Sequence, residues 1–269
     1  MAVHGQQSPA RLDAALHSLR RQTVPATEIV LVADGPLPAA LQQIIALACQ
    51  ELPIEVVALG ENRGLGAALD AGLAACTCPL VARMDSDDIA LDHRFETQLS
   101  QLEETGADIC GSAIIVVQDD GAIAPTRWMP LTHDDIVRAL WANPFAHGSV
   151  MFRRDRVLQA GGYNPDLRRQ QDYDLWFRCA EAGLRFANIA EPLLVYRDHS
   201  SSAPLPVRLR QAWRQARLGA SNAGHLRLPL WKQAACYYPL LRALLPLTLR
   251  RFLRRLEGRL DPRRHRQPS

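Results

Sequence analysis

The stretch Pro79-Leu-Val-Ala-Arg-Met-Asp-Ser-Asp-Asp88 decides how the rest of this chain is interpreted. Its apolar run, typical of a buried strand, leads directly into the carboxylates of Asp85, Asp87 and Asp88. Carboxylates this close repel one another unless a cation or hydrogen-bond donors offset their charge. Oxygen ligands of this kind suit Mg²⁺ or Mn²⁺, which bridges one or two carboxylates to substrate phosphates. The plainer alternative is that Asp87 or Asp88 caps a helix expected over 93–104.

Strands and helices alternate on both sides of this stretch. Apolar runs predict strands over 28–33, 54–59, 79–84 and 108–117, and helical periodicity predicts helices over 9–21, 37–50, 66–75 and 93–104. Such alternation indicates an α/β fold with a mostly parallel, Rossmann-like central sheet flanked by helices. The first strand is expected to be shortened to Ala2–His4. Ligands collect at the carboxyl ends of such strands, where Asp34 and Asp85 both fall.

Composition is that of a globular, cytoplasmic protein. The 269 residues are 48% hydrophobic and 22% charged, enough for one large or two small domains. The six cysteines are scattered, which predicts reduced thiols rather than a disulfide framework. Neither a signal peptide nor an apolar run long enough to span a membrane is evident.

The net charge of +3 hides an uneven distribution. Residues 204–269 carry 15 basic side chains and only Glu257 and Asp261 as acids, so the remainder of the chain is acidic. Arginines mixed with leucine and aromatic residues suit a helix lying on the inner face of an anionic plasma membrane. The alternative is a helical extension that packs on the catalytic domain and exposes a basic face. Nucleic-acid binding is not expected, because aromatic and basic residues interleave too sparsely.

Two further groups of polar residues follow. Asp172 and Asp174 begin an amphipathic helix, where either could cap the helix and Asp172 could alternatively act as a general base. His199 follows a strand-like run, where a histidine is commonly structural or merely exposed.

These segments together resemble a family 2 glycosyltransferase of the inverting type with the GT-A fold. The resemblance covers about residues 1–202 and rests on seven short motifs in family order, namely 28–35, 61–66, 82–88, 143–152, 160–163, 171–176 and 196–199. Singly each motif is weak. The order of all seven is what makes the resemblance specific.

The resemblance implies a role for individual residues. Asp34 would contact the nucleotide base, Asp85 the ribose or sugar side, and Asp87 the metal on the diphosphate. Asp172 would be the catalytic base. Apart from the resemblance, Asp88 is expected to be the residue that caps the following helix. His199 would help to hold the metal or diphosphate; Asn62 and Arg63 would help to bind the nucleotide; and the acceptor side would include His147, Gly162, Tyr163 and Trp176.

We therefore expect a metal-dependent inverting enzyme of the hexosyltransferase type. It would move a sugar from a nucleotide-diphosphate donor, most simply a UDP-sugar, to a glycan or lipid-linked acceptor in surface polysaccharide synthesis. Residues 1–203 would form the GT-A domain and 204–269 the basic helical tail. The alternatives are a sugar-nucleotide nucleotidyltransferase, which should show a Gly-rich phosphate loop, and an inactive scaffold. The possibility of an inactive scaffold comes from Gln171, where the family commonly has Glu, and from the short first strand.

Overall fold

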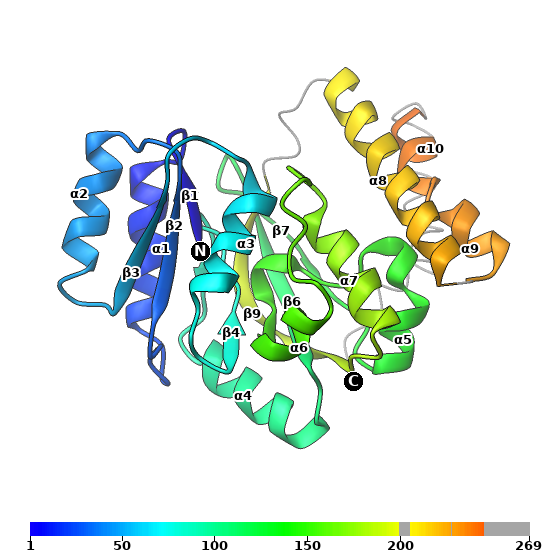
Figure 1. Ribbon diagram of the computed structural model, residues 1–269, viewed down its shortest axis with the longest axis horizontal. Coiled ribbons are helices and arrows are strands. Elements are labelled where there is room, and N and C mark those ends of the chain that lie inside the picture. Colours follow the sequence, from blue (N-terminus) through cyan, green and yellow to red (C-terminus); the bar gives the residue numbers. More distant parts are fainter. Residues whose placement is uncertain (199–204, 227, 245–269) are drawn as a thin grey trace.

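The computed structural model describes residues 1–198, 205–226 and 228–244. Its first sheet holds three parallel strands in the order β1 (Ala2–His4), β2 (Ile29–Asp34) and β3 (Ile54–Leu59). The three-residue first strand expected from the sequence is confirmed, with Val3 opposite Ala33. This sheet and its helices form one side of the molecule (Figure 1).

Helices cover both faces of the first sheet. Successive side chains of a strand point to opposite faces. Leu31 of β2 therefore packs with Leu12 of α1 (Pro9–Arg20) and Leu41 of α2 (Ala39–Ala48). Val30 and Val32 face the other way and pack with Ala68 of α3 (Leu65–Ala75). The sequence predicted all three helices.

The second sheet is mixed rather than mostly parallel. Its strands lie in the order β4-β8-β6-β9-β5. A further strand, β7, pairs with β6 and is not part of this order. Only the long central strands β6 and β9 are parallel, and the other pairs are antiparallel. The expectation of a mostly parallel sheet therefore holds for the first sheet and needs correction for the second. The bounds are β4 (Leu80–Ala82), β5 (Ile89–Ala90), β6 (Ile109–Gln118), β7 (Ile123–Arg127), β8 (Met151–Arg153) and β9 (Phe186–Asp198).

The largest core cluster lies under helix α7 (Gln171–Glu181), which the amphipathic pattern after Asp172 predicted. Its apolar face buries Tyr173, Trp176 and Phe177 in a cluster that also includes Ile109, Phe152 and Phe186 of the second sheet. The remaining helices of this half are α4 (Arg94–Thr105), α5 (His133–Arg138) and α6 (Arg154–Gln159), with short 3₁₀ turns at Leu140–Ala142 and His147–Ser149. Burial of aromatic side chains dominates the stabilisation of such a core.

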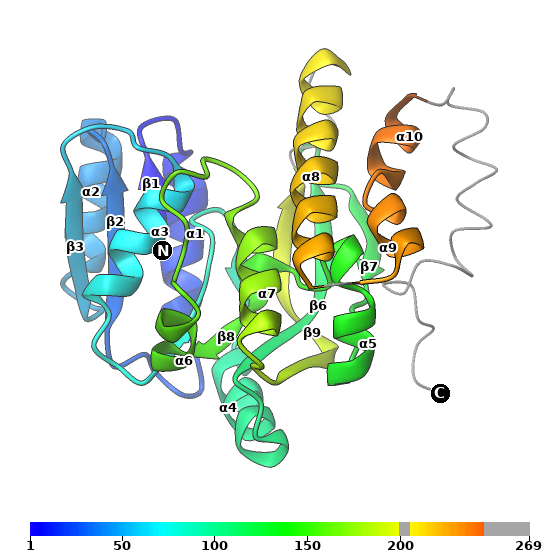
Figure 2. The ribbon, with the colours of Figure 1, turned by 45° about the vertical axis from the view of Figure 1, so that its right-hand side comes forward.

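The described part of the tail is helical and packs on the body. Helix α8 (Leu205–His225) lies against α7, and a Cβ added at Gly219 would come within 2.5 Å of the Tyr173 hydroxyl. Helices α9 (Leu230–Ala235) and α10 (Tyr238–Leu244) follow on the side of the molecule opposite α1 and α2 (Figures 1 and 2). Among the residues described, no helix is long and apolar enough to cross a bilayer. His199 and residues 245–269 lie outside the described residues.

Candidate active site

Asp34 fixes the loop before α3. It lies at the carboxyl end of β2, beside the end of parallel β3, and its side chain is buried. Its carboxylate accepts backbone N–H groups from Arg63 (2.7 Å) and Gly64 (3.0 Å). The side chain of Asn62 donates to the Asp34 carbonyl at 3.3 Å. The sequence-predicted residues Asp34, Asn62 and Arg63 are thus brought together, and both carboxylate oxygens hold the loop.

The acidic stretch alternates between buried and half-exposed residues. Ser86 and Asp88 are buried, whereas Asp85 and Asp87 are partly open to solvent. Asp85 forms a two-pronged ion pair with buried Arg83, which donates from both terminal nitrogens. Burial alone would lower the pKa of Arg83, but the Asp85 carboxylate outweighs burial and raises it. The Arg83 guanidinium therefore fixes the orientation of the Asp85 carboxylate, and Asp87 lies half-exposed at the turn that follows.

Asp88 does not cap a helix, so that expectation was wrong. Helix α4 begins only at Arg94, with His93 at its N-cap, because strand β5 intervenes. Asp88 instead turns inward and accepts the backbone N–H of Arg197 on β9 at 3.0 Å. Burial and the nearby Asp85 carboxylate raise the pKa of Asp88 well above its usual value. The residue ties the acidic stretch to the second sheet.

A second buried arginine, Arg94, supports the acidic stretch through the backbone of Arg83. Arg94 donates to the Arg83 carbonyl (2.7 Å) and to the Gln98 side chain (2.9 Å). Its complete burial lowers its pKa to about 10. Sequence reasoning gave neither Arg83 nor Arg94 a role. The available signal was a charged residue within the apolar run before Asp85.

Asp172 lies in the first turn of α7, where its carboxylate accepts a hydrogen bond from the Asn143 side chain at 3.0 Å. Asn143 has a φ of 54°, in the left-handed region that asparagine tolerates better than most residues. The backbone thus holds the Asn143 amide toward the carboxylate. Asn143 belongs to a motif noted in the sequence, but its pairing with Asp172 depends on the folded chain.

His147 and Tyr163 form a second pair. The ring nitrogen Nε2 of His147 lies 2.9 Å from the Tyr163 hydroxyl, and the His147 ring packs against buried Trp176. Burial, and then the charge of Arg83, lower the pKa of His147 well below its usual value, so the ring is neutral at pH 7. Tyr163 and Trp176 are themselves buried. Both side chains therefore contact His147 and present little surface of their own; the acceptor-side role expected for them stays a prediction.

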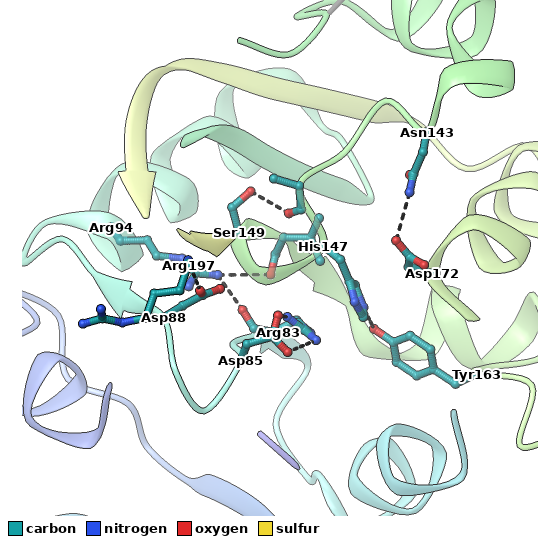
Figure 3. Close-up of polar contacts among 12 residues, drawn as sticks. Arg83, Asp85, Asp88, Arg94, Asn143, His147, Ser149, Tyr163, Asp172 and Arg197 are labelled. Carbon is teal, nitrogen blue, oxygen red and sulfur yellow. Dashed lines mark hydrogen bonds and ion pairs between the residues drawn. The ribbon is translucent and has the colours of Figure 1, made fainter. Parts of the chain in front are cut away.

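These pairs share one region of the molecule (Figure 3). Burial raises the pKa of Tyr163, and the charges of Arg83, Asp172 and Asp85 all act on its hydroxyl. Gly162, just before it, has a φ of 57°, and its carbonyl accepts a hydrogen bond from the Arg178 guanidinium at 2.8 Å. Residues far apart in sequence thus lie in the same region as the Tyr163 side chain. A carboxylate held by an amide, near an acidic strand end, suits proton removal beside a bound phosphate.

The acidic stretch fits a divalent cation that also binds its substrate. Asp87 offers carboxylate oxygens at a half-exposed turn, and Asp85 lies two residues before it. Within residues 1–198, 205–226 and 228–244 no group of three or more His, Cys, Asp or Glu side chains is arranged to enclose a metal. Mg²⁺ is commonly held by one or two carboxylates plus substrate phosphates and waters. That arrangement needs no enclosed cage.

The loop that leads to Asp172 rests on Gly66 of α3. A Cβ at Gly66 would lie 2.6 Å from the Asn164 carbonyl oxygen and closer still to that of Leu167. We expect Gly66→Ala to lower the free energy of unfolding by about 1–3 kcal/mol, since backbone on both sides cannot yield easily. Gly60→Ala is the matched control, because nothing lies within 4 Å of its added Cβ. Urea unfolding measures both, and equal midpoints would contradict the expectation.

An α/β fold that gathers carboxylates at strand ends beside a candidate base is typical of nucleotide-sugar transferases. Residues 1–162 match the family model described as Glycosyl transferase family 2. The chain therefore belongs to glycosyl transferase family 2, and it is a glycosyltransferase.

Curated relatives carry the same class of name. The chain is 38% identical over 214 residues to the amylovoran biosynthesis glycosyltransferase AmsE of Erwinia amylovora, covering 79% of each chain. It is 31% identical over 208 residues to an Escherichia coli UDP-Gal:alpha-D-GlcNAc-diphosphoundecaprenol beta-1,3-galactosyltransferase, covering 76% of this chain and 74% of the relative.

Solved structures show that the fold is GT-A. S. aureus TarS 1–349 in complex with UDP-GlcNAc superposes with a TM-score of 0.70 at 18% identity, covering 90% of this chain and 71% of that one. The mannosyltransferase PcManGT of Pyrobaculum calidifontis, in complex with GDP-Man and Mn²⁺, gives a TM-score of 0.60 at 16% identity. It covers 96% of this chain and 78% of the other. At these identities the likeness concerns the fold.

Proposed function

We propose that this chain is an inverting glycosyltransferase that moves a sugar from a UDP-sugar to a lipid-linked acceptor during surface polysaccharide synthesis. The observation that carries the proposal is that Asp172, held by Asn143, lies in the same region as the His147–Tyr163 pair and the Arg83–Asp85 ion pair (Figure 3). The names of the two relatives, one in amylovoran synthesis and one using a diphosphoundecaprenol acceptor, support the acceptor class.

Asp172 is the proton acceptor in this proposal. As an acceptor hydroxyl oxygen attacks the anomeric carbon, its proton passes to Asp172, and the bond from that carbon to the nucleoside diphosphate breaks. The new glycosidic bond forms on the opposite face, so the anomeric configuration inverts. The Asn143 side-chain amide donates to one carboxylate oxygen of Asp172 and so fixes the orientation of the carboxylate. A positioned base of this kind typically contributes about 10²–10⁴-fold to the rate.

The donor diphosphate is assigned to the acidic stretch. Asp87 would hold a divalent cation, with Asp85 oriented beside it by Arg83. When bound, Mg²⁺ or Mn²⁺ neutralises the charge that grows on the departing diphosphate. The Mn²⁺ that accompanies GDP-Man in PcManGT supports this choice of cation.

Release of nucleoside diphosphate from a panel of UDP- and GDP-sugars tests the proposal. The full chain is incubated with Mn²⁺ or with EDTA, in the presence and absence of a lipid-diphosphate GlcNAc acceptor. We expect UDP release from a UDP-sugar that requires metal and is accelerated by acceptor, with inversion visible in the anomeric NMR signal of the product. If no nucleotide sugar in the panel is consumed, the proposed activity is wrong.

A further inference from the structure

A groove of about 650 Å³ lies between the loop before α7 and helix α8. Gln170 closes part of it, since its side-chain amide donates to the backbone carbonyl of Gln211 on α8 at 3.0 Å. The volume is within the ~300–1,000 Å³ typical of small-molecule sites. The groove is lined by 166–170 from the loop and by Gln211, Trp213, Arg214, Arg217, Leu218 and Ser221 from α8.

The lining is strongly basic. Arg168 and Arg169 from the loop face Arg214 and Arg217 from α8, and Asp166 is the one acid among the lining residues. All four arginines are exposed, so their guanidinium groups can be reached from solvent. Guanidinium groups remain charged at every physiological pH and match phosphate oxygens with two parallel hydrogen bonds.

An aromatic surface borders these charges. The Trp213 side chain is 46% exposed, and the Arg217 guanidinium lies 5.5 Å from its ring centre. The cation over the ring fixes the Arg217 head at the groove. The lining thus presents both anion-binding groups and an exposed apolar ring.

The groove lies beside the candidate base. Gln170 directly precedes α7 and has a φ of 63°, and Asp172 follows two residues later. Two residues span at most about 7 Å, so the backbone of Asp172 lies within about 7 Å of that of Gln170, which lines the groove. On its other side, a Cβ added at Gly64 would touch the Arg168 side chain, so the groove also borders the loop held by Asp34.

We propose that this groove binds the diphosphate of a lipid-linked acceptor, an inference that rests on the proposed function. In a glycosyl diphosphate lipid, the sugar next to the lipid is joined directly to the diphosphate. Anchoring the diphosphate at Arg214 and Arg217 would therefore bring a hydroxyl of that sugar to Asp172. Trp213 offers its ring to the first apolar units of the lipid.

The donor diphosphate is a poorer occupant of the same groove. Its charge is matched by a cation at the acidic stretch, whereas the groove supplies its own positive charge. A bilayer of anionic headgroups is also a poorer match, since a concave groove encloses one head rather than lying flat on many.

Binding of farnesyl diphosphate to the full chain tests the inference. Isothermal titration would compare the wild type, the double variant Arg214→Ala/Arg217→Ala, and Arg210→Ala. Arg210 is an exposed arginine of the same helix outside the groove. We expect the double variant to weaken binding at least about tenfold, because two charge-assisted contacts are lost. Arg210→Ala should stay within about twofold, and added salt should weaken wild-type binding.

Further arms separate the sources of the phosphate. Farnesol should not bind, and Arg214→Lys/Arg217→Lys should keep part of the affinity because the charge remains. Equal binding of farnesyl diphosphate by the wild type and the double alanine variant would overturn the inference. The inference would also be overturned if the double alanine variant lost affinity for phosphatidylglycerol vesicles but not for farnesyl diphosphate. The groove would then bind a lipid headgroup. A wild-type chain that consumes a UDP-sugar but does not bind farnesyl diphosphate refutes the groove alone and leaves the transferase intact.

Discussion

Replacing Asp172 with asparagine is expected to lower the rate of sugar transfer by about 10²–10⁴-fold while leaving UDP-sugar binding unchanged. Asparagine has nearly the shape of aspartate and can still receive the Asn143 amide, which donates to this carboxylate at 3.0 Å. It cannot take the proton of the acceptor hydroxyl. The loss should therefore appear in kcat and not in the dissociation constant of the donor.

Glu181→Gln is the matched control for this variant. It also removes one carboxylate from α7, but at the exposed far end of the helix. We expect its turnover to equal that of the wild type. The measurement is steady-state transfer together with a donor-binding titration of each variant. Turnover of Asp172→Asn within about threefold of the wild type would assign the base to another residue.

Replacing Asp87 with alanine is expected to remove most of the metal-dependent affinity for the donor. With Mn²⁺ present, the dissociation constant of UDP should rise by at least about 10–100-fold, the range found even for residues that only support metal ligands. With EDTA, the variant and the wild type should bind UDP equally weakly. A titration of UDP at several Mn²⁺ concentrations separates the two contributions.

Asp92→Ala is the control for the acidic stretch. Asp92 lies five residues further along, exposed, and pairs with Arg21 at 3.1 Å on the surface. Such surface pairs contribute only about 0–1 kcal/mol to stability, so this variant should fold and bind normally. If Asp87→Ala keeps the metal dependence of the wild type, the cation is held elsewhere.

The longer strands could be predicted because they are largely apolar runs bounded by polar residues. The strands expected over 28–33, 54–59 and 108–117 agree with β2, β3 and β6 to within one residue at each end. The short strands β5, β7 and β8, of two to five residues, carry too little periodicity to be recognised. Their antiparallel pairing is set by partners distant in sequence, and this is why the second sheet was expected to be parallel.

The site residues also divide into those that the sequence reveals and those that only the folded chain reveals. Asp34, Asp85 and Asp172 stood out because acids after strands or before helices are visible locally. The partners that orient them were hidden, because Asn143 meets Asp172 only through a left-handed backbone turn 29 residues earlier in the chain. Asp88 was misassigned because its partner is a backbone N–H on β9. The catalytic and metal roles themselves remain predictions for the variants above.

The buried arginines beneath the acidic stretch set a limit on protein engineering. Arg83 and Arg94 are both buried and linked through the Arg83 carbonyl, and Arg83 also holds Asp85. Removing Asp85 would leave the buried Arg83 guanidinium without its carboxylate partner, which destabilises the fold because a buried charge is left without compensation. A graft that carries only Asp85–Asp88 into another scaffold would therefore leave its support behind. A transferable unit must therefore include both arginines, and also the β9 backbone that holds Asp88.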